Sequence, residues 1–216
     1  QLIAPHNGGE LTFLDPAYGP DTYISVGLAI ERDKLKKPTM AETASLVLAA
    51  FNSPKDNKYI KEIKDIMINA WLWPFTGTLY VPKGAFIQDD PEIRDGMPFM
   101  EESGLERRLG SRQVGQVVYS DDGTVRFVPF GYNVGEMSPL ELSKNAYVID
   151  LAGGEEGAEK LARVAGKYIH KPRLWSYEHV DENIIRVSAL GSWDQRLEVL
   201  GSVFGGSDGR AFGYLK

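Results

Sequence analysis

The sequence predicts an α+β fold: a mixed, mostly antiparallel sheet with three to four helices packed mainly on one face. One observation is an alternation of apolar residues, which is the period of a strand, at Ile24, Val26, Leu28 and Ile30. Another is a helical spacing of apolar residues, at Ala44, Val47, Leu48 and Phe51. Turn residues separate the two kinds of segment, so we expect helices and strands to pack in one body.

Length and composition fit a single folded domain. The chain has 216 residues, of which 43% are apolar and 25% are charged, and these proportions are close to those of ordinary globular proteins. Acidic residues, proline and glycine gather in residues 89–113. We therefore expect one α+β domain over residues 1–216, and we leave open a division into two lobes with a boundary near 89–113.

Charge, cysteine content and hydropathy exclude several classes of protein. The net charge of −6 disfavours nucleic-acid binding, because that affinity comes from lysine and arginine. The chain has no cysteine, which excludes disulfides and thiolate metal sites. No apolar run approaches the roughly 20 residues of a membrane-spanning helix, so the sequence favours a soluble and cytoplasmic protein.

The first third of the chain predicts strands followed by two helices. An irregular entry with an edge strand at residues 11–14 precedes a strand over residues 22–31. Thr39 and Glu42 have the spacing of a capping box, which starts a helix by satisfying otherwise unpaired amides. A second amphipathic helix follows, and Ser53 and Asp56 repeat the cap spacing at its predicted start, with Pro54 at the first helical position. We expect these two helices to form a hairpin over the sheet.

The middle of the chain predicts two β-hairpins. Residues 78–81 and 85–88 alternate on either side of a short loop that contains proline and glycine. Residues 117–119 and 125–128 flank Asp122-Gly123, and the glycine supplies the positive φ that a tight hairpin turn requires. Both pairs of segments are therefore expected to be antiparallel.

The last third predicts a strand–helix–strand unit after a short helix. Ser138 and Glu141 form a second capping-box pattern. Residues 146–151 are interpreted as a buried strand and residues 154–169 as a helix. Further strands are predicted over residues 184–190, 196–200 and 210–215. The unit would be a right-handed crossover if its strands are parallel.

Residues 147–157 resemble the first motif of Rossmann-like S-adenosylmethionine methyltransferases. In that family an acidic residue ends a strand before a Gly-x-Gly turn, and here Asp150 precedes glycines at 153–154. The resemblance implies a nucleotide cofactor at a helix N-terminus. Ala152 stands where the family has glycine, and glutamates at 155–156 would repel a phosphate. The favoured interpretation is a tight turn that starts a helix.

The densest group of titratable residues around a histidine is Glu178-His179-Val180-Asp181-Glu182. An imidazole beside a carboxylate can act as a general base. His179 as base, with Asp150 or Asp181 orienting it, would suit a hydrolase or a transferase. The same segment is also typical of a hydrated loop. The two remaining histidines give no zinc-ligand spacing, so we predict no metal site and name no cofactor.

Two further segments are candidates for binding. Trp193 lies in a predicted turn beside polar residues, where burial is difficult, and an exposed tryptophan is typical of interfaces. A glycine-rich segment, residues 201–210, ends with Asp208 and Arg210 and could form an amide-lined nest for an anion. We therefore expect a binding domain that uses Trp193, Asp208 and Arg210, in loops at one end of the sheet.

The partner predicted for this domain is a protein or a small anionic ligand, and a homo-oligomer is left open. The alternative function is the hydrolase or transferase that uses His179. No serine stands in a Gly-x-Ser-x-Gly pattern, so the sequence gives no nucleophile for acyl transfer. Binding is for this reason the first hypothesis and catalysis the second.

Overall fold

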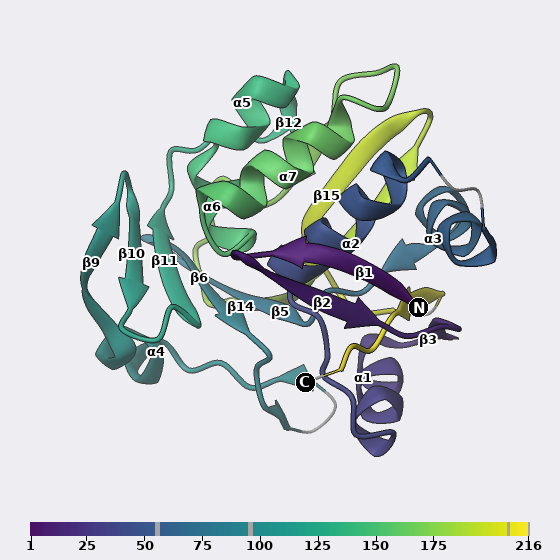
Figure 1. Cartoon of the computed structure of the whole chain (residues 1–216). Helices are drawn as coiled ribbons and strands as arrows, with labels where there is room; N and C mark the ends of the chain where they lie inside the picture. Colours follow the sequence, from purple (N-terminus) through teal and green to yellow (C-terminus); the bar gives the residue numbers. More distant parts are fainter. Residues whose placement is uncertain (55–56, 95–96, 207, 216) are drawn as a thin grey trace.

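The computed structural model confirms the α+β class and describes residues 1–54, 57–94, 97–206 and 208–215. One large sheet forms its centre (Figure 1). Its main strands are, in spatial order, β12 (Gly135–Glu136), β13 (Arg173–Trp175), β15 (Arg196–Val203), β14 (Ile184–Trp193), β5 (Thr76–Val81), β6 (Gly84–Asp89), β11 (Val125–Pro129), β10 (Val117–Ser120) and β9 (Leu109–Val114). Joined to it beside β14 are β3 (Tyr18–Asp21), β4 (Trp71–Leu72) and β16 (Gly209–Ala211). Separate pairs are β1 (Leu2–His6) with β2 (Gly9–Phe13) and β7 (Ile93–Arg94) with β8 (Met97–Pro98).

The sheet is mixed and mostly antiparallel, as predicted. Within the described strands, the parallel pairs are β13 with β15 and β16 with β4. The predicted hairpins are present: β5 pairs with β6, and β10 pairs with β11 across the turn that contains Asp122-Gly123. β14 and β15 form a third antiparallel hairpin. Alternating apolar residues on both sides of a turn signal were therefore sufficient to place the two predicted hairpins.

Helices cover the sheet mainly on one face, and the described part of the chain has seven of them instead of three to four. The first face carries α2 (Met40–Asn52), α3 (Lys58–Asn69), α5 (Pro139–Lys144), α6 (Ala146–Leu151) and α7 (Glu155–Ala165) (Figure 1). The opposite face carries α1 (Tyr23–Arg32) and α4 (Glu102–Arg108), each over its own small apolar cluster. The helices beyond the predicted number are α4, which is short, and α1 and α6, which replace predicted strands.

The strand predicted over residues 22–31 is wrong, because this segment is helix α1. Thr22 caps it: its Oγ1 accepts a hydrogen bond from the Ser25 amide at 3.2 Å. The buried residues follow a helical period, namely Tyr23, Val26, Gly27 and Ile30, whereas Leu28 is exposed. Apolar residues at every second position contain i, i+4 pairs, so they fit both periods, and packing on Phe75 selects the helix.

The buried strand predicted over residues 146–151 is also wrong, because this segment is helix α6. The Asn145 side-chain oxygen accepts hydrogen bonds from the amides of Tyr147 at 3.0 Å and Val148 at 3.3 Å, which is an N-cap. A short apolar run does not distinguish a strand from a buried helix. The strand–helix–strand crossover is therefore absent, and the resemblance to methyltransferases, which needs a strand before its glycine turn, does not hold.

The capping boxes predicted at Thr39 and Ser138 are present, whereas α3 is capped by Asn57 and not by Ser53, whose predicted acidic partner Asp56 lies outside the described residues. The Thr39 amide donates to the Glu42 carboxylate at 2.7 Å, and the Glu42 amide donates to the Thr39 hydroxyl at 3.4 Å. Ser138 and Glu141 make the same reciprocal contacts at 2.6 and 3.2 Å. These contacts fix the starts of α2 and α5.

The N-terminal and C-terminal parts of the chain lie side by side. β3 pairs with β16, and Tyr214 bridges to Phe13 and Lys36. On either side of residues 89–113, β6 and β11 are neighbours in the sheet, and a division into lobes stays a prediction. No helix in the described part of the chain is both long and apolar enough to cross a membrane.

Candidate functional site

Trp193 lies at the tip of the β14–β15 hairpin. It pairs with Arg196 across a two-residue turn in which Asp194 and Gln195 both have positive φ, at 50° and 52°. Two successive positive φ values define the turn that matches the twist of a hairpin. The turn directs the indole away from the core, and the side chain is 72% exposed.

Two other large apolar side chains are exposed beside this tryptophan. Ile68 near the end of α3 is 59% exposed, and Ile169 after α7 is 75% exposed. Together they line an open groove of about 490 Å³, which we call the Trp193 groove; its residues are Ile68, Lys167, Tyr168, Ile169, Ser192, Trp193, Asp194 and Gln195. Three segments far apart in the sequence thus build one apolar surface.

Backbone and side-chain contacts hold the three walls of the groove together. The Ser192 hydroxyl donates to the Met67 carbonyl oxygen at 2.8 Å, which ties β14 to α3. The His170 amide donates to the Gln195 carbonyl oxygen at 3.1 Å, which ties the segment after α7 to the hairpin turn. The Tyr168 ring packs on Phe51 with centroids 5.5 Å apart. The groove is therefore preformed.

The charged side chain of the groove that lacks an ion-pair partner among the described residues is a lysine. Asp194 has a cationic neighbour, Arg196, at 3.9 Å. Lys167 is exposed and forms no ion pair with any residue that the structure describes. The groove thus combines apolar side chains with one unpaired ammonium group, although the whole chain carries a net charge of −6.

The other two predicted binding residues lie outside this groove. Arg210 lines a different groove with Lys58, Glu62 and other residues of α3, and its guanidinium donates to the Gly19 carbonyl oxygen at 3.2 Å. Asp208 is exposed and has a positive φ of 76°. The structure therefore does not bring Trp193 into one described pocket with Asp208 or Arg210.

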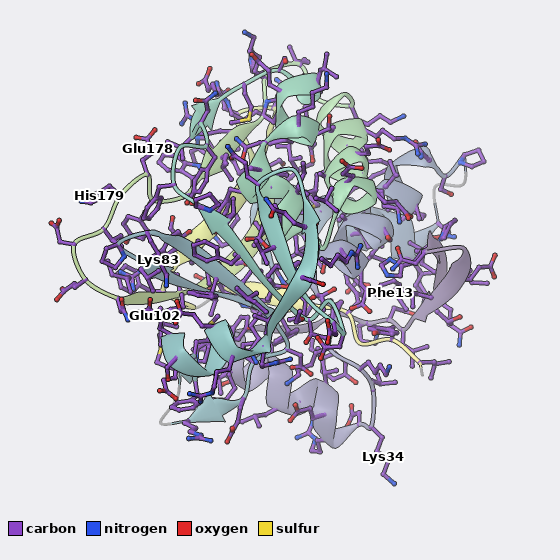
Figure 2. The ribbon with its side chains drawn as sticks, turned by 90° about the vertical axis from the view of Figure 1, so that its left-hand side faces the viewer. Phe13, Lys34, Lys83, Glu102, Glu178 and His179 are labelled. Carbon is purple, nitrogen blue, oxygen red and sulfur yellow. The ribbon has the colours of Figure 1, made fainter. Side chains whose placement is uncertain are left out.

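The predicted catalytic residues are divided between the surface and the core. His179 Nε2 lies 3.0 Å from Asp181 Oδ1, with side chains 69% and 96% exposed, and His179 projects from the loop between β13 and β14 (Figure 2). Asp150 is fully buried. His179 does not line the Trp193 groove, and catalysis by these residues stays a prediction from the sequence.

Asp150 belongs to a buried charge network that sequence patterns did not reveal. The Arg126 guanidinium, 1% exposed, donates to the two carboxylate oxygens of Asp89 at 2.6 and 3.0 Å. Its Nε donates to the backbone carbonyl of Asp150 at 2.7 Å and lies 3.4 Å from that residue's carboxyl. Burial raises the pKa of Asp150 well above its ordinary value, and Arg126 opposes this only in part. We call these three residues the Arg126 network.

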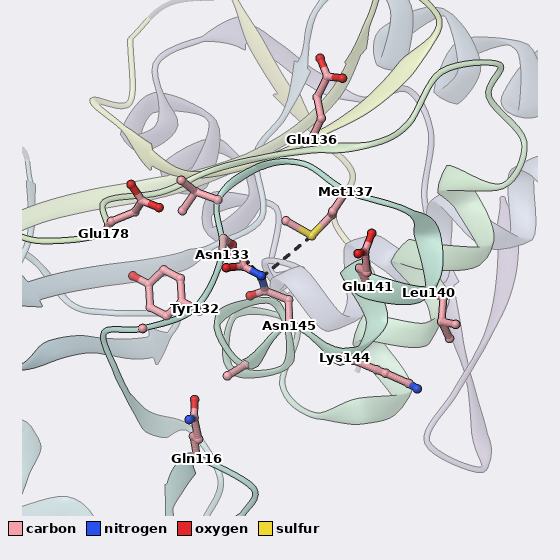
Figure 3. Close-up of a pocket in the computed structure, with 13 residues that line it drawn as sticks. Gln116, Tyr132, Asn133, Glu136, Met137, Leu140, Glu141, Lys144, Asn145 and Glu178 are labelled. Atoms are coloured by element: carbon pink, nitrogen blue, oxygen red, sulfur yellow. Dashed lines mark hydrogen bonds between the residues drawn. The ribbon is translucent and has the colours of Figure 1, made fainter.

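A larger polar cleft of about 640 Å³ lies beside α5 (Figure 3). Several of its charged or polar groups already have partners: Glu136 pairs with Arg173 and Arg196, and Glu141 caps α5. The Asn145 amide donates to the Asn133 carbonyl oxygen at 2.7 Å. These three residues of the cleft therefore hold its own walls.

Comparison with known proteins identifies the architecture. No protein-family model matches the chain, and no curated protein matches it. A solved structure from work on the accommodation of massive sequence variation in Nanoarchaeota by the C-type lectin fold covers 93% of this chain and 98% of its own, with 12% identity and a TM-score of 0.56. The chain has a C-type lectin-like fold. At 12% identity the likeness extends to the fold alone.

Proposed function

We propose that this C-type lectin-like chain is a binding domain that docks an acidic segment of another protein in the Trp193 groove. The observation that carries the proposal is the convergence of Ile68, Ile169 and Trp193, each more than half exposed, in one preformed groove. Exposed apolar side chains are common singly, but a contiguous group marks a contact surface. Tryptophan is also enriched among the residues that dominate binding energy.

The charge of the groove favours an acidic partner over a second copy of this chain. Lys167 offers an ammonium group without an internal carboxylate partner among the described residues. Two copies of a chain with a net charge of −6 repel each other, whereas an acidic segment with a large apolar side chain complements both features of the groove. The open, apolar shape suits a peptide better than a small anion.

The C-type lectin-like fold supports the proposal. The similar structure comes from work on the accommodation of massive sequence variation by that fold. In this chain, Trp193, Asp194 and Gln195 are all exposed at the β14–β15 tip, where a partner can reach them, and most of the strand residues behind them are buried.

Selection from a displayed random-peptide library tests the proposal. Wild-type protein is the bait, and Trp193→Ala protein is a parallel bait that is not used to deplete the library. We expect the retained peptides to combine a Leu, Phe or Trp with Asp or Glu, and to bind the variants Phe204→Ala and Leu140→Ala as they bind the wild type. Phe204 and Leu140 are matched controls, because they are 71% and 64% exposed and lie outside the groove.

Light scattering on the unliganded protein completes the test. A monomer that binds acidic peptides supports the proposal. A dimer that Trp193→Ala dissociates would assign the groove to a second copy and contradict the choice of partner. Peptides without acidic residues, or peptides whose binding is equal in wild type and Trp193→Ala, would contradict the proposed chemistry of the groove.

A further inference from the structure

A second cleft, independent of the Trp193 groove, lies between α1 and the segment that follows β6. It has a volume of about 340 Å³ and is lined by Tyr23, Ile24, Gly27, Leu28, Glu31, Lys37, Phe75, Asp90, Pro91, Glu92 and Ile93. We call it the Tyr23 cleft. Its floor is aromatic, its walls are apolar and its rim is charged, and its volume lies within the range of small-molecule sites.

The aromatic floor comes from Tyr23 and Phe75, whose ring centroids are 4.8 Å apart. α1 approaches Phe75 closely because residue 27 is glycine: a Cβ there would lie 2.8 Å from the Phe75 ring. The Lys37 ammonium lies 5.6 Å from the centroid of Phe75, within reach of the negative face of an aromatic ring. The floor therefore already attracts one cation of the chain itself.

The rim carries one more negative charge than its own cations neutralise. Lys37 pairs with both Glu31 and Asp90, the latter at 2.7 Å. Glu92 is neutralised by Arg94, which contacts both of its carboxylate oxygens at 2.9 and 2.8 Å. Two carboxylates thus share a single lysine, and one further positive charge would balance them.

The Tyr23 hydroxyl is a buried polar group beside this cleft without an internal partner in the described part of the chain. Tyr23 is 2% exposed, and its hydroxyl has no hydrogen-bond partner among the described residues. Buried hydroxyl groups almost always have a partner, because an unpaired one loses its bonds to water without replacement. Burial and nearby Asp90 raise the pKa of Tyr23 well above its ordinary value, so the group remains a neutral phenol that can both accept and donate.

From these contacts we infer that the Tyr23 cleft binds a small organic ammonium ion with an apolar body. The ammonium group lies near Glu31 and Asp90, and the Tyr23 hydroxyl, buried in the unliganded protein, turns to accept a hydrogen bond from it. The apolar body contacts Phe75, Leu28 and Ile93. An anion is repelled by the rim, and a neutral molecule loses the attraction of the unbalanced carboxylate.

Three probes of similar shape test the class of ligand: 2-phenylethylammonium, 2-phenylethanol and 3-phenylpropanoate. Binding is followed by amide chemical shifts in two-dimensional NMR on the full chain. We expect the ammonium ion to shift amides of residues 23–28 and 90–93, and to bind about fivefold more tightly than the alcohol, as one partly exposed ion pair provides. The carboxylate should not bind there. Equal binding of all three, shifts elsewhere only, or no binding would overturn the inference.

Variants separate a ligand site from a structural contact. Glu31→Gln should weaken binding of the ammonium probe about fivefold, whereas Glu159→Gln, an exposed change of the same charge on α7, should leave it unchanged. Tyr23→Phe should weaken binding without lowering the thermal midpoint of the unliganded protein, since it removes an unpaired buried hydroxyl. If Tyr23→Phe and Glu31→Gln leave the probe's affinity unchanged, the carboxylates of the cleft only hold Lys37 in place and the cleft is not a ligand site.

Discussion

The Trp193 groove and the Arg126 network depart in opposite ways from the usual rule that apolar side chains are buried and charged ones are exposed. The groove exposes apolar side chains at the surface, and nothing in the described chain covers them. The network buries a guanidinium and the Asp150 carboxyl in the interior and leaves the Asp89 carboxyl partly exposed. Asp89 and backbone carbonyls surround Arg126 with partners. The Arg126 guanidinium, which its neighbours satisfy, is explained by stability, whereas a group of apolar side chains that no described residue covers points to something outside the chain.

This contrast predicts opposite responses to substitution. Changes in the Arg126 network should alter stability and leave peptide binding intact in the protein that remains folded. Changes in the Trp193 groove should alter binding and leave stability intact. The Tyr23 cleft combines both cases, because Lys37 has partners and the Tyr23 hydroxyl has none among the described residues.

The largest expected effect on stability is that of Arg126→Met. It leaves Asp89 partly buried without its cation and should lower the free energy of unfolding by about 3–5 kcal/mol. Chemical denaturation measures this loss. Arg107→Met, at an exposed site on α4, is the control and should change it by less than about 0.5 kcal/mol. Equal losses in the two variants would mean that Arg126 is not a structural centre.

Gly201→Ala should have the next largest effect. A Cβ at this position would lie 1.8 Å from the hydroxyl of the buried Tyr147, and that hydroxyl also contacts Tyr80 at 2.7 Å. Overpacking of this kind costs about 1–3 kcal/mol. Gly206→Ala is the matched control, since no atom lies within 4 Å of its Cβ position. A thermal midpoint that stays at the wild-type value in Gly201→Ala would show that the core can yield there.

Asp150→Asn should stabilise the protein increasingly as the pH rises. The folded-state pKa of Asp150 lies above the value in the unfolded chain, so the folded protein retains a proton that the unfolded chain releases. Wild-type stability therefore falls as the pH rises above about 4, and asparagine, which needs no such proton, removes this dependence. Denaturation at pH 4 and pH 8 measures the difference between the two proteins. A gain that is larger at pH 4 would contradict the direction of the shift.

The smallest effect on stability is expected in the groove. Trp193→Ala should change the free energy of unfolding by less than about 0.5 kcal/mol, as is usual for exposed positions. Trp73→Ala removes a tryptophan that is 1% exposed and should cost about 3–5 kcal/mol. If both substitutions destabilise the protein equally, the indole of Trp193 is part of the core and not of a docking surface.

The sequence predicted those elements whose signals are local. The Asp122-Gly123 turn and the two capping boxes depend on a few adjacent residues, and the structure contains all three. α1 was mistaken for a strand because Ile24, Val26, Leu28 and Ile30 fit a period of two, while the helical stripe was set by contacts with Trp73 and Phe75. α6 was missed because the cap residue Asn145 was not recognised.

The candidate sites depend on contacts that no local pattern encodes. Trp193 was singled out because it lies in a turn, and its exposure agrees with that reasoning. Its companions, Ile68 and Ile169, come from distant segments and look like ordinary core positions in the sequence. Asp150 was considered a catalytic candidate from its motif, whereas its burial with Arg126 follows from a sheet that brings β6 beside β11.

The affinity of one selected acidic peptide for the wild type and for Trp193→Ala tests docking in the groove most directly. Isothermal titration calorimetry gives both dissociation constants, and Phe204→Ala controls for the loss of an exposed ring elsewhere. We predict that Trp193→Ala weakens binding at least about tenfold, the size of a dominant interface residue, and that Phe204→Ala leaves it unchanged. Equal affinity for wild type and Trp193→Ala would contradict docking in this groove.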